Sequence, residues 1–316
     1  MASGSTGVVL AALVANGAIA IMKFIGFLLT GSPSMLSETY HSLSDTGNQV
    51  FLLIGIRYSD RSASRVHPFG YGKAQFFYAF LVSVLLFGIA GWESLNHGIH
   101  AIQTAGQTES GTFVVPFVGA EVETFWLNVV VLSLAIVFEV WALAKANAEL
   151  KRQMDQFGWS SIREAFGKTS DVTTLTAFTE DAIALGGAAI ALVGVTLTRY
   201  TGNGIYDAIS AAIIGVLLMG FALALAWENK RLLLGESFPS DVERRLQQIV
   251  SSHSGVVHVD SFRTVFFGPQ QAMVAAEVTF ERSTVPDEIE EAIDEIEAKL
   301  ETADSRVAQI YIEPER

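Results

Sequence analysis

Six long segments of the chain are apolar enough to cross a hydrocarbon core as helices, which takes about 20 residues each. The second and fifth carry the most polar residues, so a hydropathy scan alone is expected to miss part of either one. Small residues recur in these segments, as in GGAAIALVG, and allow helices to approach closely in lipid. We therefore predict six transmembrane helices, at residues 7–30, 34–57, 74–102, 123–146, 171–199 and 205–229.

The pattern changes from about residue 236. An amphipathic helix is predicted first, then two strands joined by a turn at Gly268 and Pro269, a second helix, and a last strand. These elements fall at residues 239–253, 256–268, 271–281, 286–301 and 306–314. The sequence thus predicts a polytopic α-helical membrane protein, with a transmembrane domain at 1–235 and a cytoplasmic α-β-β-α-β (ferredoxin-like) domain at 236–316.

Composition supports a membrane protein. Half of the 316 residues are hydrophobic and only 17% are charged, whereas about a quarter are charged in soluble domains. The chain has no cysteine, which excludes disulfides and thiolate metal sites. The start lacks a basic region followed by an apolar one, so we expect no cleaved leader.

The net charge of −13 is unevenly spread, because residues 236–316 contribute −10 and the rest of the chain −3. An acidic domain does not favour nucleic acid as a partner. We interpret it as a solvated surface, with attraction of cations as the alternative.

Basic residues in the loops predict the orientation of the bundle. Eleven Lys and Arg residues lie in the loops after the second, fourth and sixth segments, whereas the opposite loops contain only Arg199. The positive-inside rule then places both termini in the cytoplasm, with the lipid bilayer around the six helices.

The stretch SETYHSLSDTGNQ puts ionisable groups inside the second apolar segment. His41 and Asp45 are four residues apart and share one helix face, which Asn48 continues. Imidazole and carboxylate together are suitable ligands for zinc, but one helix offers only two of them. Glu180 and Asp181 in the fifth segment are the expected partners. Burying four such groups without a cation or protons is very costly, so we predict an ion-binding site.

Other buried polar residues have simpler interpretations. Lys23 is expected to neutralise Glu38 or Glu139 as a structural ion pair, rather than to take part in transport. Asn16 either makes a hydrogen bond between helices or lines the pathway.

Three motifs together resemble the cation diffusion facilitator family. They are LLTGSPSMLSETYHSLSDTGNQ, RVHPFGYGK and LLLGESFPSD, in this order along the chain. The resemblance implies proton-coupled export of a divalent metal, most often zinc, by a homodimer with a metal site between the second and fifth helices. It implies a secondary transporter rather than an enzyme, with no catalytic cofactor and with Zn²⁺ and H⁺ as its cargo. We expect it in a prokaryotic plasma membrane.

Carried over to this sequence, the family pattern gives His41 and Asp45 on the second helix and Asp181 on the fifth. Ala177 stands where the family has a fourth ligand. The Glu-Asp pair at 180 and 181 resembles the branch that contains the animal mitochondrial zinc transporter. Glu180 is then either a substitute ligand or a proton carrier.

The resemblance leaves further alternatives open. His67 in the loop motif is a possible secondary metal ligand, although Pro68 and the neighbouring glycines also suit a structural turn. The cargo could be Mn²⁺, Fe²⁺ or Co²⁺ instead of zinc. A non-transporting regulatory partner is a third interpretation, prompted by Ala177. A membrane metallohydrolase lacks any HExxH motif.

Overall fold

The computed structural model describes residues 2–104, 112–114, 121–168 and 172–315. By internal contacts the chain divides into two compact units. The first comprises residues 1–54, 78–162 and 173–227, and the second comprises 55–77, 163–172 and 228–316. The predicted domain boundary between residues 235 and 236 remains a prediction.

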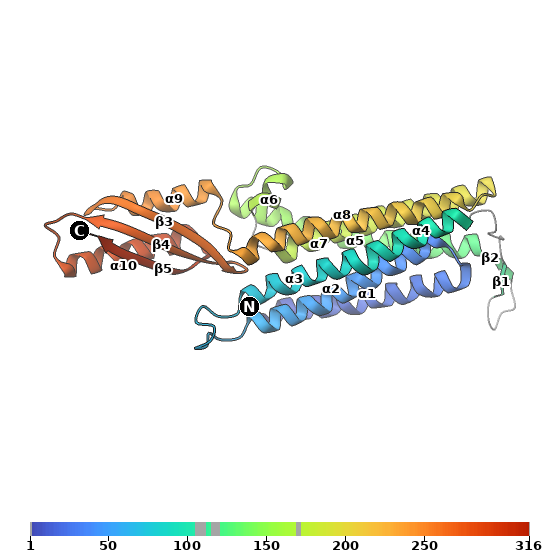
Figure 1. The fold of residues 1–316 in the computed structure, drawn as a ribbon, viewed down its shortest axis with the longest axis horizontal. Coiled ribbons are helices and arrows are strands. Elements are labelled where there is room, and N and C mark those ends of the chain that lie inside the picture. Colours follow the sequence, from blue (N-terminus) through green and yellow to red (C-terminus); the bar gives the residue numbers. More distant parts are fainter. Residues whose placement is uncertain (1, 105–111, 115–120, 169–171, 316) are drawn as a thin grey trace. The chain divides into compact units, whose positions relative to one another are not determined.

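The first unit is built from long helices that run side by side (Figure 1). Each predicted apolar segment corresponds to a helix, and the third is one continuous run of α3, a six-residue π-helix η1, and α4. The helices are α1 Ala2–Thr30, α2 Pro33–Ser59, α3 Lys73–Leu85, η1 Leu86–Gly91, α4 Trp92–Thr104, α5 Thr124–Phe157, α7 Val172–Thr201 and α8 Ile205–Leu234.

Four helical stretches among the described residues are long and apolar enough to cross a membrane. They are Lys73–Thr104, Thr124–Phe157, Ala177–Thr201 and Ile205–Leu234. Asn16–Thr30 is a shorter apolar helix, and α2 does not qualify because its polar residues lower its mean hydropathy. The structure therefore supports a helical membrane protein, while the count of six membrane-spanning helices remains a prediction.

Small residues bring α4 and α8 into close contact. A methyl group added at Gly98 would lie 2.5 Å from the backbone nitrogen of Ala212, and one at Gly215 would meet the backbone of Leu95. Such close approach increases van der Waals contact, which drives helix association in lipid. The apolar core of this unit, which includes Met35, Leu132 and Leu218, is formed by residues of α2, η1, α5, α7 and α8.

Three short elements were not predicted from the sequence. Strands β1 Thr112–Val114 and β2 Glu121–Glu123 form an antiparallel pair, and α6 spans Ile162–Lys168. Elements of three to seven residues contain too few positions to show a hydrophobic period.

The C-terminal elements of the second unit follow the predicted order. They are α9 Ser240–Ser251, β3 Val256–Gly268, β4 Gln271–Phe280, α10 Pro286–Ala303 and β5 Val307–Glu315. The sheet order is β3-β4-β5, with β3 antiparallel and β5 parallel to β4. A parallel pair needs a long crossover, and α10 provides it. Helices α9 and α10 contact each other, and alternate residues of β4 are buried, as expected for a sheet covered on one face.

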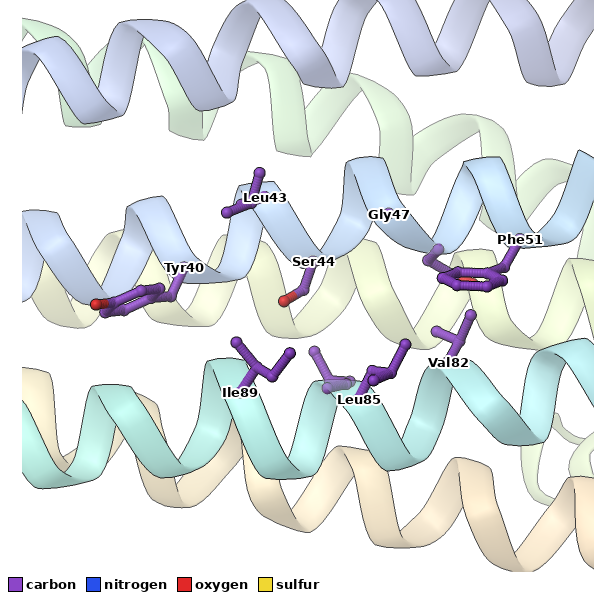
Figure 2. Close-up of a pocket in the computed structure, with 10 residues that line it drawn as sticks. Tyr40, Leu43, Ser44, Gly47, Phe51, Val82, Leu85 and Ile89 are labelled. Atoms are coloured by element: carbon purple, nitrogen blue, oxygen red, sulfur yellow. The ribbon is translucent and has the colours of Figure 1, made fainter.

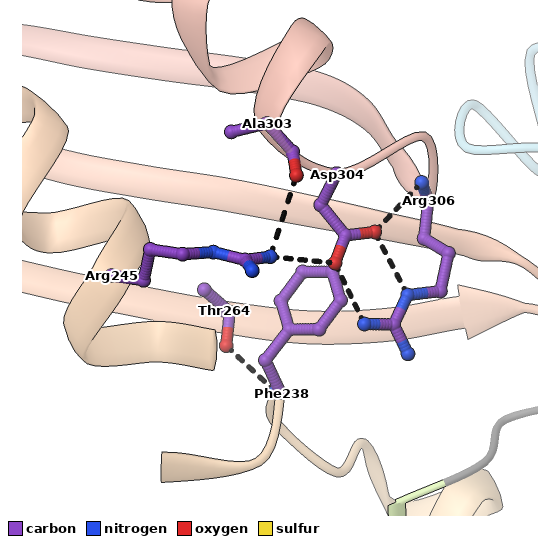
Figure 3. Close-up of polar contacts among 6 residues, drawn as sticks. All are labelled: Phe238, Arg245, Thr264, Ala303, Asp304 and Arg306. Atoms are coloured by element: carbon purple, nitrogen blue, oxygen red, sulfur yellow. Dashed lines mark hydrogen bonds and ion pairs between the residues drawn. The ribbon is translucent and has the colours of Figure 1, made fainter. Parts of the chain in front are cut away.

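A buried ion pair joins the end of α10 to the start of β5 (Figure 3). Arg306 donates from Nε and Nη2 to the two carboxylate oxygens of Asp304 at 2.9 and 2.7 Å, and both side chains are 3% exposed. Arg245 of α9 lies 3.7 Å from the same carboxylate. Burial alone would raise the pKa of Asp304, but the hydrogen bonds and charge of Arg306, with a contribution from Arg245, lower it.

We predict that Asp304→Asn destabilises this unit by roughly 3 kcal/mol, because it removes the negative charge that forms a buried ion pair with the Arg306 guanidinium. Since folding lowers the pKa, the contribution is full above the unfolded value of about 3.9 and is lost as the pH falls below it. Hydrogen exchange of the β4 amides in the full-length protein measures the effect at pH 7. Asp294→Asn, an exposed change on α10, is the control and should stay within about 0.5 kcal/mol of wild type. Equal protection in both variants would contradict the prediction.

Candidate functional site

The polar face of α2 is buried inside the bundle. His41 is completely buried and Asp45 is 6% exposed. Nδ1 of His41 lies 3.3 Å from Oδ1 of Asp45, one helical turn further on. Neither ring nitrogen of His41 has a hydrogen-bond partner among the described residues. An imidazole with an unused lone pair beside a carboxylate is chemically suited to bind a divalent metal.

The structure brings α2 and α7 together at this face. The carboxyl groups of Asp45 and Glu180 lie within hydrogen-bonding reach of each other. The side-chain amide of Asn48 donates to both oxygens of Glu180 at 3.0 Å. Two carboxylates in close contact repel each other unless a cation or a proton lies between them. Such a pair is chemically suited to bind a cation or a proton.

Asp181 lies next to this pair and extends it towards α5. It interacts electrostatically with Glu180 and with Glu139 of α5. Glu139 is 9% exposed and also interacts with Lys23. The acids predicted from three segments of the sequence thus form one connected electrostatic network across α2, α5 and α7.

Lys23 of α1 lies beside this network. Its Nζ donates to Oε2 of Glu38 at 2.8 Å, and both side chains are fully buried. Of the two acids expected to neutralise it, Glu38 therefore makes the direct ion pair and Glu139 interacts through space. Removing one partner of such a pair leaves an uncompensated buried charge.

The remaining candidate residues are less closely tied to the network. Asn16 is half-buried on α1. His67 is exposed, stacks on Tyr71 with ring centroids 4.3 Å apart, and its carbonyl accepts hydrogen bonds from Ser64 and Gly70. These contacts are those of a tight structural turn, and a metal role for His67 remains a prediction.

Among the residues that the structure describes, no group of three or more His, Asp or Glu side chains is arranged to hold a metal ion. His41, Asp45, Glu180 and Asp181 therefore do not form a closed ligand shell in this conformation. Their assignment as metal ligands remains a prediction.

Sequence reasoning missed a second buried polar cluster. Asp207, in the first turn of α8, accepts hydrogen bonds from the hydroxyl groups of Ser32 and Ser34. Oγ of Ser32 also accepts from the amide of Met35 near the start of α2. Serine is common at helix starts, so its pattern alone did not point to a partner 173 residues away in sequence.

A cavity of about 170 Å³ lies between α2 and the third apolar helix. Figure 2 shows Tyr40, Ser44 and Phe51 on the α2 side of this cavity and Val82, Leu85 and Ile89 on the other. Its walls are almost entirely apolar, so it does not suit a metal cation. Asn48 lines the cavity and also binds Glu180, which separates the cavity from the acidic pair.

A known family of membrane proteins matches most of this chain. Residues 9–234 match the cation efflux transmembrane domain family. The mitochondrial proton-coupled zinc antiporter SLC30A9 of Mus musculus is 29% identical over 282 residues, which cover 89% of this chain and 47% of that protein. Metal tolerance protein C4 of Arabidopsis thaliana is 26% identical, over 85% of this chain and 56% of its own length.

A bacterial relative is matched over more of its length. The cation-efflux pump FieF of Escherichia coli is 25% identical over 260 residues, which cover 82% of this chain and 76% of that protein. By contrast, the chain spans about half the length of the mitochondrial and plant relatives. The match over residues 9–234 confirms the resemblance predicted from the motifs, and the chain belongs to the cation efflux, or cation diffusion facilitator, family of membrane proteins.

Proposed function

We propose that the chain exports a divalent metal cation, with Zn²⁺ as the preferred cargo, in exchange for protons. The observation that carries this proposal is the contact between the carboxyl groups of buried Asp45 and partly buried Glu180, with His41 one turn away, in a member of the cation efflux family. The relatives named as zinc antiporter, metal tolerance protein and cation-efflux pump support it.

The position of the contact along α2 fits a transport site. Asp45 is twelve residues from the start of α2 at Pro33, which is about 18 Å along a helix. A hydrocarbon core is about 30 Å thick, so a helix that begins at one face places Asp45 near the middle. Such a site can be opened to either side of the membrane in turn.

In the proposed mechanism, His41, Asp45 and Asp181 bind the metal, and Glu180 either completes the shell or carries protons. Metal binding requires an unprotonated imidazole and ionised carboxylates, so binding of the metal releases protons. Alternate exposure of one site that holds either protons or the metal gives antiport without ATP. Imidazole favours zinc over manganese, whose sites are richer in oxygen.

The proposed topology has six membrane-spanning helices with both termini in the cytoplasm, because the Lys and Arg residues of the loops lie mostly on one side. We further propose a homodimer in a prokaryotic plasma membrane, with residues 236–316 as a dimerisation and regulatory domain. The runner-up is a non-transporting partner of an active relative, because Ala177 cannot bind metal. A transport assay on the purified protein alone distinguishes the two.

We predict that His41→Ala and Asp45→Ala each abolish zinc uptake by proteoliposomes that carry a proton gradient. Each change removes a ligand that no neighbouring side chain of α2 can replace. Uptake is followed with a zinc-sensitive dye, and proton movement with a pH-sensitive dye. His100→Ala, which removes an exposed histidine of α4, is the matched control and should transport normally. Transport at the wild-type rate by either site variant would refute the assignment.

We predict that Glu180→Gln weakens zinc binding about 10- to 100-fold, the loss usual for groups that support a metal site. If Glu180 completes the shell, Ala177→His should not tighten binding in the wild-type background, because no coordination position is open. The same change should restore binding in the Glu180→Gln background. Calorimetry with Zn²⁺ on the detergent-purified chain measures all four proteins. Tighter binding by Ala177→His alone would instead identify Glu180 as a proton carrier.

A further inference from the structure

Glu38 joins three helices at one buried carboxylate. Its Oε2 accepts the hydrogen bond from Lys23 of α1 at 2.8 Å. Its Oε1 has no hydrogen-bond partner among the described residues and faces Gly187 of α7. A methyl group at Gly187 would lie 2.5 Å from this oxygen, so only a glycine leaves room for the carboxylate here.

The contact between Glu38 and Gly187 is in register with the contact between Asp45 and Glu180. Asp45 lies seven residues after Glu38 on α2, and Glu180 lies seven residues before Gly187 on α7. Seven residues are close to two helical turns, so each helix presents both of its contact residues on the same face. Helices α2 and α7 therefore run antiparallel along these two contacts. We call the line of contact from Glu38 and Gly187 to Asp45 and Glu180 the seam.

The carboxylate of Glu38 has little freedom to move away. It is completely buried, and the ammonium group of Lys23, which is also completely buried, holds its other oxygen. Moving it would break a charge-assisted hydrogen bond that water cannot replace at this depth. The separation of α2 and α7 at this point is therefore set by the carboxylate and the missing side chain of Gly187.

We propose that Lys23, Glu38 and Gly187 are positioning residues that set the seam between α2 and α7 and thereby hold Asp45 opposite Glu180. This inference rests on the proposed function, since it assigns a role to residues outside the metal site itself. It gives the buried ion pair a task beyond stability. A shift of α7 at Gly187 would also displace Glu180, two turns away, relative to Asp45 and the other residues proposed to bind the metal.

The neighbouring glycine provides a matched control. A methyl group at Gly186 would meet no atom within 4 Å, whereas one at Gly187 meets Glu38. Gly186→Ala and Gly187→Ala therefore make the same change in helix propensity at adjacent positions. They differ in whether the added methyl group collides with the carboxylate.

We predict that Gly187→Ala weakens binding of Zn²⁺ to the purified full-length chain about 10- to 100-fold, as loss of a group that orients metal ligands does. Gly186→Ala should bind as the wild type does. Glu38→Asp, which shortens the carboxylate by one methylene group, should restore binding when combined with Gly187→Ala. If Gly187→Ala does not fold, recovery of folded, zinc-binding protein in the double variant supports the proposal, and failure to recover it overturns the proposal.

A distance measurement separates this inference from the proposed function. Because the chain has no cysteine, spin labels can be placed through Leu43→Cys on α2 and Val193→Cys on α7, both exposed positions. The distance between labels should increase in Gly187→Ala and not in Gly186→Ala, whether or not the protein moves zinc. An unchanged distance, or a changed distance with unaltered zinc binding, would overturn the positioning role. A wild type that neither binds nor transports Zn²⁺ would refute the proposed function instead.

Discussion

The contact between two carboxyl groups inside an apolar helix bundle is the constraint on which the rest of this structure depends. Asp45 and Glu180 come from different helices, and Asp45 is buried while Glu180 is partly buried. Bringing like charges together at low dielectric is unfavourable unless a cation or a proton lies between them. The fold must therefore hold the two carboxyl groups together and leave room for a cation or a proton between them.

Asn48, Lys23 and Glu38 support the contact between Asp45 and Glu180. Asn48 donates two hydrogen bonds to Glu180, which fixes the orientation of that carboxylate without adding charge. Lys23 supplies a fixed positive charge to this network, and its ammonium group is bound by Glu38 rather than by Asp45. An ammonium group paired directly with Asp45 would occupy the place proposed for the metal cation. Pairing it with Glu38 keeps its charge nearby and leaves the acidic pair free to bind.

Much of this arrangement could be predicted from the sequence, because the relevant patterns are local. Apolar length predicted the helices, period-two and period-3.6 patterns predicted the order of the C-terminal elements, and the four-residue spacing of His41 and Asp45 predicted a shared face. Hydropathy alone does not identify α2 as a membrane span, since the candidate site residues His41 and Asp45 also make the helix polar. The sequence did not predict the contact of Glu38 with Gly187 or of Asp207 with Ser32 and Ser34, because each depends on which helix lies opposite. A glycine in an apolar helix has the same local pattern whether it packs against a carboxylate or against nothing.

Ala177 stands where the family pattern has a metal ligand, and helix geometry explains the consequence. Ala177 and Asp181 are one turn apart and share a face of α7, whereas Glu180 is about 100° away from Asp181 around the helix. A ligand at 177 would therefore approach the cation from the same side as Asp181. Glu180 instead contacts Asp45 and is held by Asn48, so its carboxylate approaches from the α2 seam. The family pattern has a His or Asp ligand at the position of Ala177, away from the acid of the second helix. In this chain the extra acid is Glu180, and its carboxyl group contacts that of Asp45. Two acids in contact repel each other more strongly than two separated ones, so the proposed exchange of metal for protons is assigned to the contact between α2 and α7.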